Sequence, residues 1–327
     1  MKKLLLIVGA VVAVLVVGAV VFVSSKPDHR AASSETFEAT PERLARGKYL
    51  VENITNCLHC HSEMNLEKFG TPPVPGTEGK GGGFCLDASM GFPGKVCASN
   101  ISSDKETGIG AWTDGEIARA IREGVSRDGT PLFPVMPYPF YRNMSDEDVK
   151  SIVVFLRTLP PIHHKVAPRE LEPPLNVLVR FMPKPLEGPV AEQDLTDLKV
   201  RGRYLVEMGA CGDCHTPKDD KGNPLPGREL SGGQEFKMPW GTFRTANLTP
   251  HATGLGQWNK ETFIARFKAY ANPEVRDAKV DPKNNTIMGW YAYARLTDED
   301  LGAIYDHLRS LPPVDNAVNR VAAPAVP

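Results

Sequence analysis

The sequence contains the stretch Arg46-Gly47-Lys48-Tyr49-Leu50-Val51-Glu52, followed closely by Cys57-Leu58-His59-Cys60-His61. Similar motifs occur later in the chain, in the same order, as Arg201-Gly202-Arg203-Tyr204-Leu205-Val206-Glu207 and Cys211-Gly212-Asp213-Cys214-His215. The match covers motif, spacing and order, so it indicates an internal duplication. An architecture of two similar units follows from it.

Each copy closes with a segment that has the pattern of a buried helix. Ser145 and Thr297 each precede three acidic residues, which is typical of an N-cap and a first helical turn. The apolar residues that follow recur at i, i+3, i+4 and i+7 and predict one buried stripe. They are Val149, Ile152, Val153 and Leu156 in the first copy, and Leu301, Ile304, Tyr305 and Leu308 in the second. The opening helix of the first copy is expected to start at Thr40, with Pro41 in its first turn.

Length and composition are those of a globular chain with two domains. It has 327 residues, 24% of them charged, and a net charge of -1, which gives no electrostatic reason to expect a nucleic-acid partner. We therefore exclude nucleic acid. The expected division is an anchor or signal at 1–25, a tether at 26–38, a first domain at 39–161, a Pro-rich linker at 162–192, a second domain at 193–315 and a flexible tail at 316–327.

The N-terminus carries an apolar run, Leu4 to Val23, after Lys2 and Lys3. As a helix, this run would be about 30 Å long, which matches the hydrocarbon core of a bilayer. A cleavable signal usually has a shorter apolar region, of about 7 to 15 residues, and a cleavage site of small residues. We expect an uncleaved transmembrane helix that interacts with membrane lipid, with a cleaved signal as the alternative. Either way the body would be exported.

The two Cys-x-x-Cys-His motifs carry the chemistry. Two thiols at i and i+3 can each form a thioether with a vinyl group of haem, and the adjacent His can supply an imidazole to the iron. A lone Cys-x-x-Cys could instead form a redox disulfide or half of a zinc site. Two copies in one duplicated frame, each followed by His, favour two covalently bound haem c groups. Their predicted attachment residues are Cys57, Cys60, His61, Cys211, Cys214 and His215.

The sixth ligand of each iron is expected to be a methionine. Met136 and Met288 lie at nearly equal distances after their motifs, each just before the closing helix. Met90 and Met238 form a rival pair. Ligation by two histidines in the first unit would require His163 or His164 from beyond the closing helix. With His and Met ligands the iron is closed to outside ligands and suited to one-electron transfer.

Other residues of the repeat could also contact the cofactor. Trp112 and Trp258 end repeated Gly-rich loops, and each could pack on the porphyrin edge or donate its N–H to a propionate. Arg157 and Arg309 could pair with propionates or remain as surface cations near helix C-termini. We interpret His163, His164, His251 and His307 as surface or structural residues.

Cys85 and Cys97 lie in a Gly-rich insertion that only the first copy has. In an exported protein, such a pair most simply forms a disulfide that closes a loop. Two free thiols are the alternative.

With these residues identified, the chain resembles the cytochrome c subunits of membrane-bound bacterial dehydrogenases for alcohols, aldehydes and sugar acids. The matching words, apart from the Cys motifs, are Asn100-Ile101-Ser102, Gly108-Ile109-Gly110-Ala111-Trp112, Val135-Met136-Pro137-Tyr138, Ser145-Asp146-Glu147-Asp148-Val149, Ile287-Met288-Gly289-Trp290 and Leu296-Thr297-Asp298-Glu299-Asp300-Leu301. The resemblance covers roughly residues 40 to 315. It also implies that Met136 and Met288 bind iron. Many such subunits carry three haem motifs, whereas this chain has two.

The expected fold is mainly α: two tandem class I-like cytochrome c domains plus the N-terminal transmembrane helix. The expected function is to carry single electrons in a periplasmic or membrane respiratory chain, from a partner dehydrogenase to a downstream oxidase or cytochrome. The chain would be a single-pass protein of the cytoplasmic membrane, with its haem domains in the periplasm or on the outside face, and not itself an enzyme. The alternatives are a dihaem peroxidase, a thiosulfate-oxidising cytochrome, or a sensor or assembly module.

Overall fold

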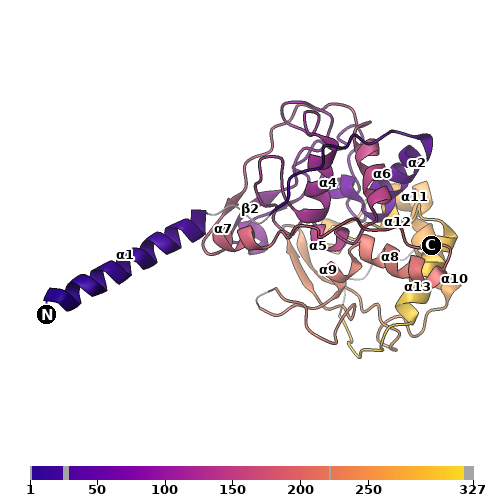
Figure 1. Cartoon of the computed structure of the whole chain (residues 1–327). Helices are drawn as coiled ribbons and strands as arrows, with labels where there is room; N and C mark the ends of the chain where they lie inside the picture. Colours follow the sequence, from indigo (N-terminus) through magenta and orange to yellow (C-terminus); the bar gives the residue numbers. More distant parts are fainter. Residues whose placement is uncertain (1, 25–28, 221, 320–327) are drawn as a thin grey trace.

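Two similar sets of helices follow one another in the computed structural model, which describes residues 2–24, 29–220 and 222–319. The first set is α2 (Pro41–Tyr49), the π-helical η1 (Leu50–Ile54), α3 (Cys57–Cys60), the 3-10 turn η2 (Ala88–Met90), α4 (Asp114–Glu123), α5 (Tyr138–Tyr141) and α6 (Asp146–Leu156). The second set is α8 (Leu198–Met208), α9 (Cys211–His215), α10 (Lys260–Lys268), η4 (Ala269–Ala271), α11 (Pro273–Asp277), η5 (Pro282–Asn284), α12 (Trp290–Tyr293) and α13 (Asp298–Arg309). The predominantly helical fold is confirmed, and both sets share one body (Figure 1).

The helices begin at the residues that the capping pattern predicted. The hydroxyl of Thr40 accepts the N–H of Arg43 at the start of α2. Ser145 and Thr297 accept the N–H groups of Asp148 and Asp300 in the same way, at the starts of α6 and α13. The apolar stripes predicted for α6 and α13 are buried.

The opening and closing helices of each repeat pack directly on one another, α2 on α6 and α8 on α13. Gly47 and Gly202, from the repeated Arg-Gly-Lys/Arg-Tyr word, lie at these crossings. A Cβ added to Gly47 would lie 1.9 Å from the carbonyl oxygen of Ser151, and one added to Gly202 would lie 2.0 Å from that of Ala303. The repeated glycine is therefore explained by close approach of two helix backbones.

The same word also joins the two repeats. Arg46 donates two hydrogen bonds to Asp148 of its own repeat, at 2.7 and 2.8 Å, and Tyr204 of the other repeat donates to the same carboxylate at 2.7 Å. The second copy mirrors this arrangement: Asp300 accepts from Arg201 of its own repeat and from Tyr49 of the first. Each closing helix therefore carries, in its first turn, a buried carboxylate that both repeats bind.

We expect Tyr49→Phe and Tyr204→Phe each to lower the free energy of unfolding by about 1.5–3 kcal/mol, because each removes a hydrogen bond to a buried charged group. Tyr138→Phe is the matched control: this tyrosine is also buried, but its hydroxyl has no hydrogen-bond partner among the described residues. Urea unfolding of the purified variants measures the free energy of unfolding, which should be lower in Tyr49→Phe and Tyr204→Phe than in Tyr138→Phe. Equal losses in all three variants would contradict this account of the contacts.

The contribution of Tyr49 should also depend on pH. Burial, and then the hydrogen bond to Asp300, raise the pKa of Tyr49 to about 12. A raised pKa in the folded state gives stability that is complete below the unfolded pKa of about 10 and is lost as the pH rises towards 12. The difference in unfolding free energy between wild type and Tyr49→Phe should therefore shrink between pH 9 and 12. If the difference in unfolding free energy grows between pH 9 and 12, Tyr49 does not make this hydrogen bond to Asp300.

The strands are short and lie outside the helical core. The order in the first sheet is β1 (Cys85–Leu86), β2 (Gly94–Cys97), β3 (Glu170–Leu171), and β4 (Glu235–Met238) pairs with β5 (Gly241–Arg244). Cys85 and Cys97 are partners in the antiparallel register of β1 and β2 and form a disulfide. Strand β3 belongs to the Pro-rich segment between the repeats, which also holds α7 (Leu175–Leu178) and η3 (Val179–Phe181).

The expectation of a transmembrane helix is wrong. The chain forms α1 (Lys2–Ser24), which extends away from the body in Figure 1. A span requires about 20 consecutive, predominantly apolar residues. Within residues 2–24, 29–220 and 222–319, no helix combines the length and the apolar character needed to cross a bilayer. The single-pass location and the contact with membrane lipid were expected from that helix, so they are not supported either.

The segments flanking the body are partly attached to it. Arg30 pairs with Glu123, and the N–H of Phe37 donates to Asp114 at 2.8 Å, so this part of the expected tether contacts α4. At the other end, the side chain of Asn316 donates to the carbonyls of Ser231 and Gly232. The end of the expected tail, 320–327, and the start of the tether, 26–28, lie outside the described residues, as do residues 1 and 25 of the expected anchor.

Candidate functional site

Each Cys-x-x-Cys-His motif lies on a short helix, α3 or α9, that starts at a sharp change in chain direction. Asn56 and Ala210, which precede the two motifs, have positive φ values of 45° and 49°. This left-handed region is uncommon for residues other than glycine. The duplicated turn points all four cysteine side chains into the interior, where they line one cavity.

The two motif histidines are oriented alike. The Nδ1 of His61 lies 2.6 Å from the carbonyl oxygen of Ser99, and the Nδ1 of His215 lies 2.8 Å from that of Ala246. A carbonyl can only accept, so Nδ1 carries the proton and the lone pair of each neutral ring is on Nε2. Burial lowers the pKa of His61 and favours this neutral form. A hydrogen bond that fixes the tautomer is the usual support of a metal-binding histidine.

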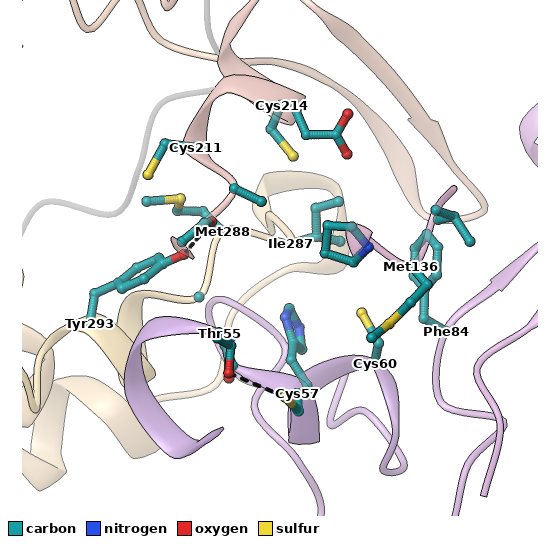
Figure 2. A pocket seen from close by; sticks show the side chains of 18 of the residues that line it. Thr55, Cys57, Cys60, Phe84, Met136, Cys211, Cys214, Ile287, Met288 and Tyr293 are labelled. Atoms are coloured by element: carbon teal, nitrogen blue, oxygen red, sulfur yellow. Dashed lines mark hydrogen bonds between the residues drawn. The ribbon is translucent and has the colours of Figure 1, made fainter. Parts of the chain in front are cut away.

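The cavity between the repeats has a volume of about 1110 Å³ and is lined by both motifs. It exceeds the 300–1,000 Å³ of a typical pocket for one small ligand. Met136 and Met288 line it, and Figure 2 shows their side chains projecting into the space that holds the four cysteines. Met64 lines it as well. The rival pair, Met90 and Met238, is absent from the described residues of its wall.

The thiols fit covalent attachment to an apolar group better than they fit the alternatives. Burial raises the pKa of Cys60, Cys211 and Cys214 to about 12. A redox-active dithiol or a zinc thiolate needs a lowered thiol pKa. In the described part of the chain no group of three or more His, Cys, Asp or Glu side chains could hold a metal ion by itself. The residues present therefore fit a large apolar cofactor that brings its own iron.

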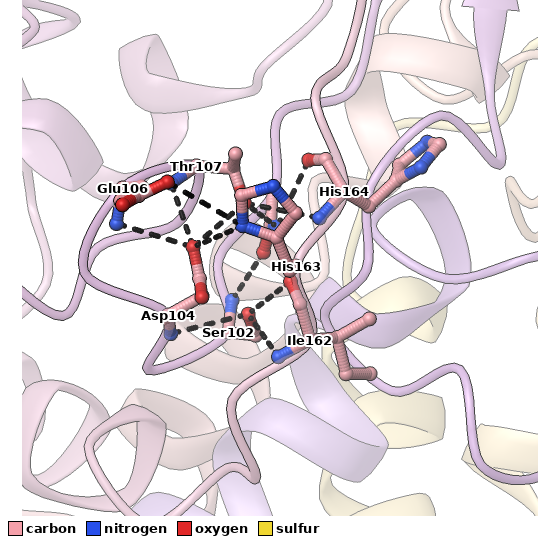
Figure 3. Close-up of polar contacts among 8 residues, drawn as sticks. Ser102, Asp104, Glu106, Thr107, Ile162, His163 and His164 are labelled. Atoms are coloured by element: carbon pink, nitrogen blue, oxygen red, sulfur yellow. Dashed lines mark hydrogen bonds and ion pairs between the residues drawn. The ribbon is translucent and has the colours of Figure 1, made fainter.

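The described histidines outside the two motifs are not part of the cavity wall. Figure 3 shows His163 facing Asp104 and Glu106, at 3.6 and 3.8 Å, beside a loop that Ser102 and Thr107 fix by hydrogen bonds to the segment of Ile162 and His164. His163, His164, His251 and His307 are not among the described residues of the cavity wall. Inside the first motif, His59 does line the cavity, and its Nε2 lies 2.8 Å from the hydroxyl of Thr71.

The two tryptophans and the two helix-end arginines have different surroundings. Trp112 and Trp258 line the cavity and pack against the core. Arg157 instead binds Asp114 and the carbonyls of Ile109 and Trp112, and Arg309 donates to the carbonyl of Leu255. These arginines fix the Gly-rich loops, a role that the sequence interpretation missed.

Two tyrosines and two arginines of the cavity wall were also missed. Tyr141 and Tyr293, at equivalent repeat positions, donate to the carbonyls of Thr55 and Gly209, beside the two motifs. Aligning the short helices α5 and α12 would have found them. Arg244 and Arg266 line the second half of the cavity. The comparison of the two copies could not identify these arginines, because the equivalent positions of the first copy carry Cys97 and Ala120.

The cavity is therefore asymmetric in charge. Among its described lining residues, arginine occurs only in the second repeat, and lysine is not found. Arg266 stacks over the rings of Trp290 and Tyr270, at 5.2 and 5.5 Å. Arg244 pairs with Glu235, and the wall residue Asp213 is paired with Lys218 at 2.6 Å. Arg266 is thus the main source of positive charge in the wall.

Comparison with known proteins agrees with this geometry. The family model described as cytochrome c matches residues 200–312. The chain is 32% identical over 230 residues to a dihaem cytochrome c-type protein of Cereibacter sphaeroides, covering 68% of this chain and 73% of the relative. It is 30% identical over 294 residues to the fructose dehydrogenase cytochrome subunit of Gluconobacter japonicus, covering 86% of this chain and 56% of the relative.

A third relative is the gluconate 2-dehydrogenase cytochrome c subunit of Pantoea cypripedii, 29% identical over 297 residues, with 84% of this chain and 60% of the relative covered. The chain thus spans little more than half the length of the dehydrogenase subunits that it matches. The chain belongs to the c-type cytochromes, proteins with covalently bound haem c.

Proposed function

We propose that the chain binds two haem c groups and passes single electrons from a partner dehydrogenase to a downstream oxidase or cytochrome. The observation that carries the proposal is the single cavity lined by both Cys-x-x-Cys-His motifs and by Met136 and Met288. The relatives named as dehydrogenase cytochrome subunits support the choice of partner.

Each part of the wall has a task in this proposal. The thiols of Cys57 and Cys60, and of Cys211 and Cys214, would add to the haem vinyl groups and form the thioethers. His61 and His215 would bind iron through Nε2, and Met136 and Met288 would supply the second protein ligand of each iron. Haem iron supplies reversible one-electron oxidation and reduction. The apolar wall would exclude water, and one histidine and one methionine ligand on each iron would leave no open site for a substrate such as peroxide.

The test is an anaerobic reductive titration of the purified protein, followed by addition of hydrogen peroxide. We expect two electrons to be taken up per chain and no catalytic consumption of peroxide. Rapid turnover of peroxide would contradict the carrier and favour a dihaem peroxidase. Uptake of a single electron would contradict the count of two haems.

The charge asymmetry predicts an order for the two potentials. Positive charge close to an iron stabilises its reduced form, so the second haem, beside Arg266, should have the higher reduction potential. Arg266→Gln should lower one of the two potentials and leave the other unchanged, and the potential that moves should be the one that Met288→Ala also changes. The control is Arg276→Gln, because Arg276 pairs with Asp277 outside the cavity wall. A change in the reduction potential of the first haem alone, or no change in either potential, would contradict this assignment.

A further inference from the structure

The second methionine is held in place by the first repeat. Its loop contains Asn285, which is buried, with 2% of its surface exposed. The Asn285 amide nitrogen donates to the carbonyls of Leu66 and Lys68, at 3.0 and 2.9 Å, and its oxygen accepts the N–H of Gly70 at 2.9 Å. We name residues 65–71 of the first repeat the supporting loop. Three hydrogen bonds from one side chain thus join the supporting loop to the methionine loop.

This connection extends from Asn285 to Met288. The Asn285 oxygen also accepts the N–H of Thr286 at 2.8 Å, and the hydroxyl of Thr286 accepts the N–H of Met288 at 3.1 Å. The backbones of the two loops are in close contact as well. A Cβ added to Gly70, whose φ is +74°, would lie 2.8 Å from the carbonyl oxygen of Met288.

Surrounding contacts fix the supporting loop against the second repeat. Phe69 stacks on Tyr270, with 5.4 Å between ring centroids, and Lys68 pairs with Asp277 at 2.7 Å. Glu67 contributes twice: its carboxylate pairs with Lys279 at 2.8 Å, and its carbonyl accepts the N–H of Val280 at 2.9 Å. The Met288 loop therefore rests on a well-anchored surface of the other repeat.

Among the described residues, the loop of Met136 has no counterpart of Asn285 that joins it to the other repeat. Phe133 lies three residues before Met136, where the second copy has Asn285. The ring of Phe133 contacts that of Phe92, at 5.1 Å, and Phe92 belongs to the insertion closed by the Cys85–Cys97 disulfide. The two repeats therefore support their methionine loops by different means.

We propose that the supporting loop, acting through Asn285 and Gly70, is a positioning element for the Met288–iron bond, so that the first repeat controls axial ligation of the second haem. This inference rests on the proposed role of Met288 as an iron ligand. A rigid loop would keep the Met288 thioether in place to bind iron, whereas a displaced loop would weaken this bond and leave one coordination position open.

The main variant is Gly70→Ala, which adds one methyl group in the first repeat, against the Met288 carbonyl. The matched control is Gly76→Ala. Gly76 also has a positive φ, +83°, in the same repeat, but a Cβ there would meet nothing within 4 Å. Both variants place an alanine at a positive φ, so the difference between them reports the contact with Met288. Asn285→Ala removes the hydrogen bonds without adding bulk, and it tests the proposal even if Gly70→Ala does not fold.

The measurements are the intensity of the methionine-to-iron charge-transfer band of the oxidised protein and the CO bound per chain after reduction. We expect Gly70→Ala and Asn285→Ala to lose up to half of the band and to bind up to one CO. Gly76→Ala should match wild type. The double variant Gly70→Ala with Met288→Ala should bind no more CO than Met288→Ala alone, because both changes act on the same iron.

Three results would overturn the inference: no CO binding by Gly70→Ala and Asn285→Ala while Met288→Ala binds CO, equal effects of Gly70→Ala and Gly76→Ala, or two CO per chain in the double variant. A failure of Met288→Ala itself to open an iron would instead contradict the proposed ligand. The two failures are therefore distinguishable.

Discussion

Met136→Ala and Met288→Ala should each open one iron to CO while both haems stay covalently attached. An alanine methyl group cannot reach the iron, whereas attachment depends on the cysteine thiols, which neither change touches. We expect each single variant to lose half of the methionine-to-iron charge-transfer band and to bind one CO per chain in the reduced state. The variant with both substitutions should bind two. Absorption spectroscopy with CO titration measures both quantities.

The matched control is the rival pair, Met90→Ala and Met238→Ala, because neither residue belongs to the described wall of the cavity. Both variants should behave like wild type in CO binding. Met64 needs a third control, since it does line the cavity. An open iron in Met64→Ala, with unchanged binding in Met136→Ala, would assign the first ligand to Met64 instead.

Gly47→Ala and Gly202→Ala should each lower the free energy of unfolding by about 3 kcal/mol or more, the upper end of the cost of overpacking. The added Cβ would lie at 2.0 Å or less from a backbone carbonyl oxygen of the facing helix, so the helices must separate. Denaturant unfolding monitored by circular dichroism measures the loss. Failure of either variant to accumulate as folded protein would agree with the same cause.

Gly302→Ala is the matched control for this pair, because Gly302 is also a buried helical glycine and lies on α13. Its added Cβ would lie 3.5 Å from the nearest atom, an ordinary contact. Here the better helix propensity of alanine should raise the free energy of unfolding by about 0.5–1 kcal/mol. Equal destabilisation of Gly302→Ala and Gly202→Ala would contradict the role assigned to the helix crossings.

The opening and closing helices were predictable because each has a local sequence pattern, and the duplication repeats that pattern in both copies. Ser145 and Thr297 cap helices with acidic first turns, and the apolar stripes have the period of a buried helix. The contacts between the repeats have no such signal. Tyr49 and Asp300 are far apart in sequence, and nothing local to either shows that they meet. Pairing between distant segments depends on how the two units dock.

In the N-terminal segment, the local signal predicts the helix correctly but not its function. An apolar run of twenty residues predicts a helix, and α1 forms there, but the inference from helix to membrane span is wrong for the described residues. The wall of the cavity was predictable only where residues repeat. Met136 and Met288 were found by their matching positions, whereas Arg266 and Asn285 were missed because the first copy has Ala120 and Phe133 instead. A residue that differs between the two copies can be assigned a role only when the structure shows that it lies in or beside the shared cavity.

The most direct test of the account is the visible spectrum of the purified protein, recorded oxidised, reduced, and reduced with CO, together with the ratio of haem to protein. We expect two low-spin haems per chain, a methionine-to-iron charge-transfer band in the oxidised state, and no change on addition of CO. A high-spin signal with CO binding, or a ratio of one haem per chain, would contradict a closed carrier with two haems.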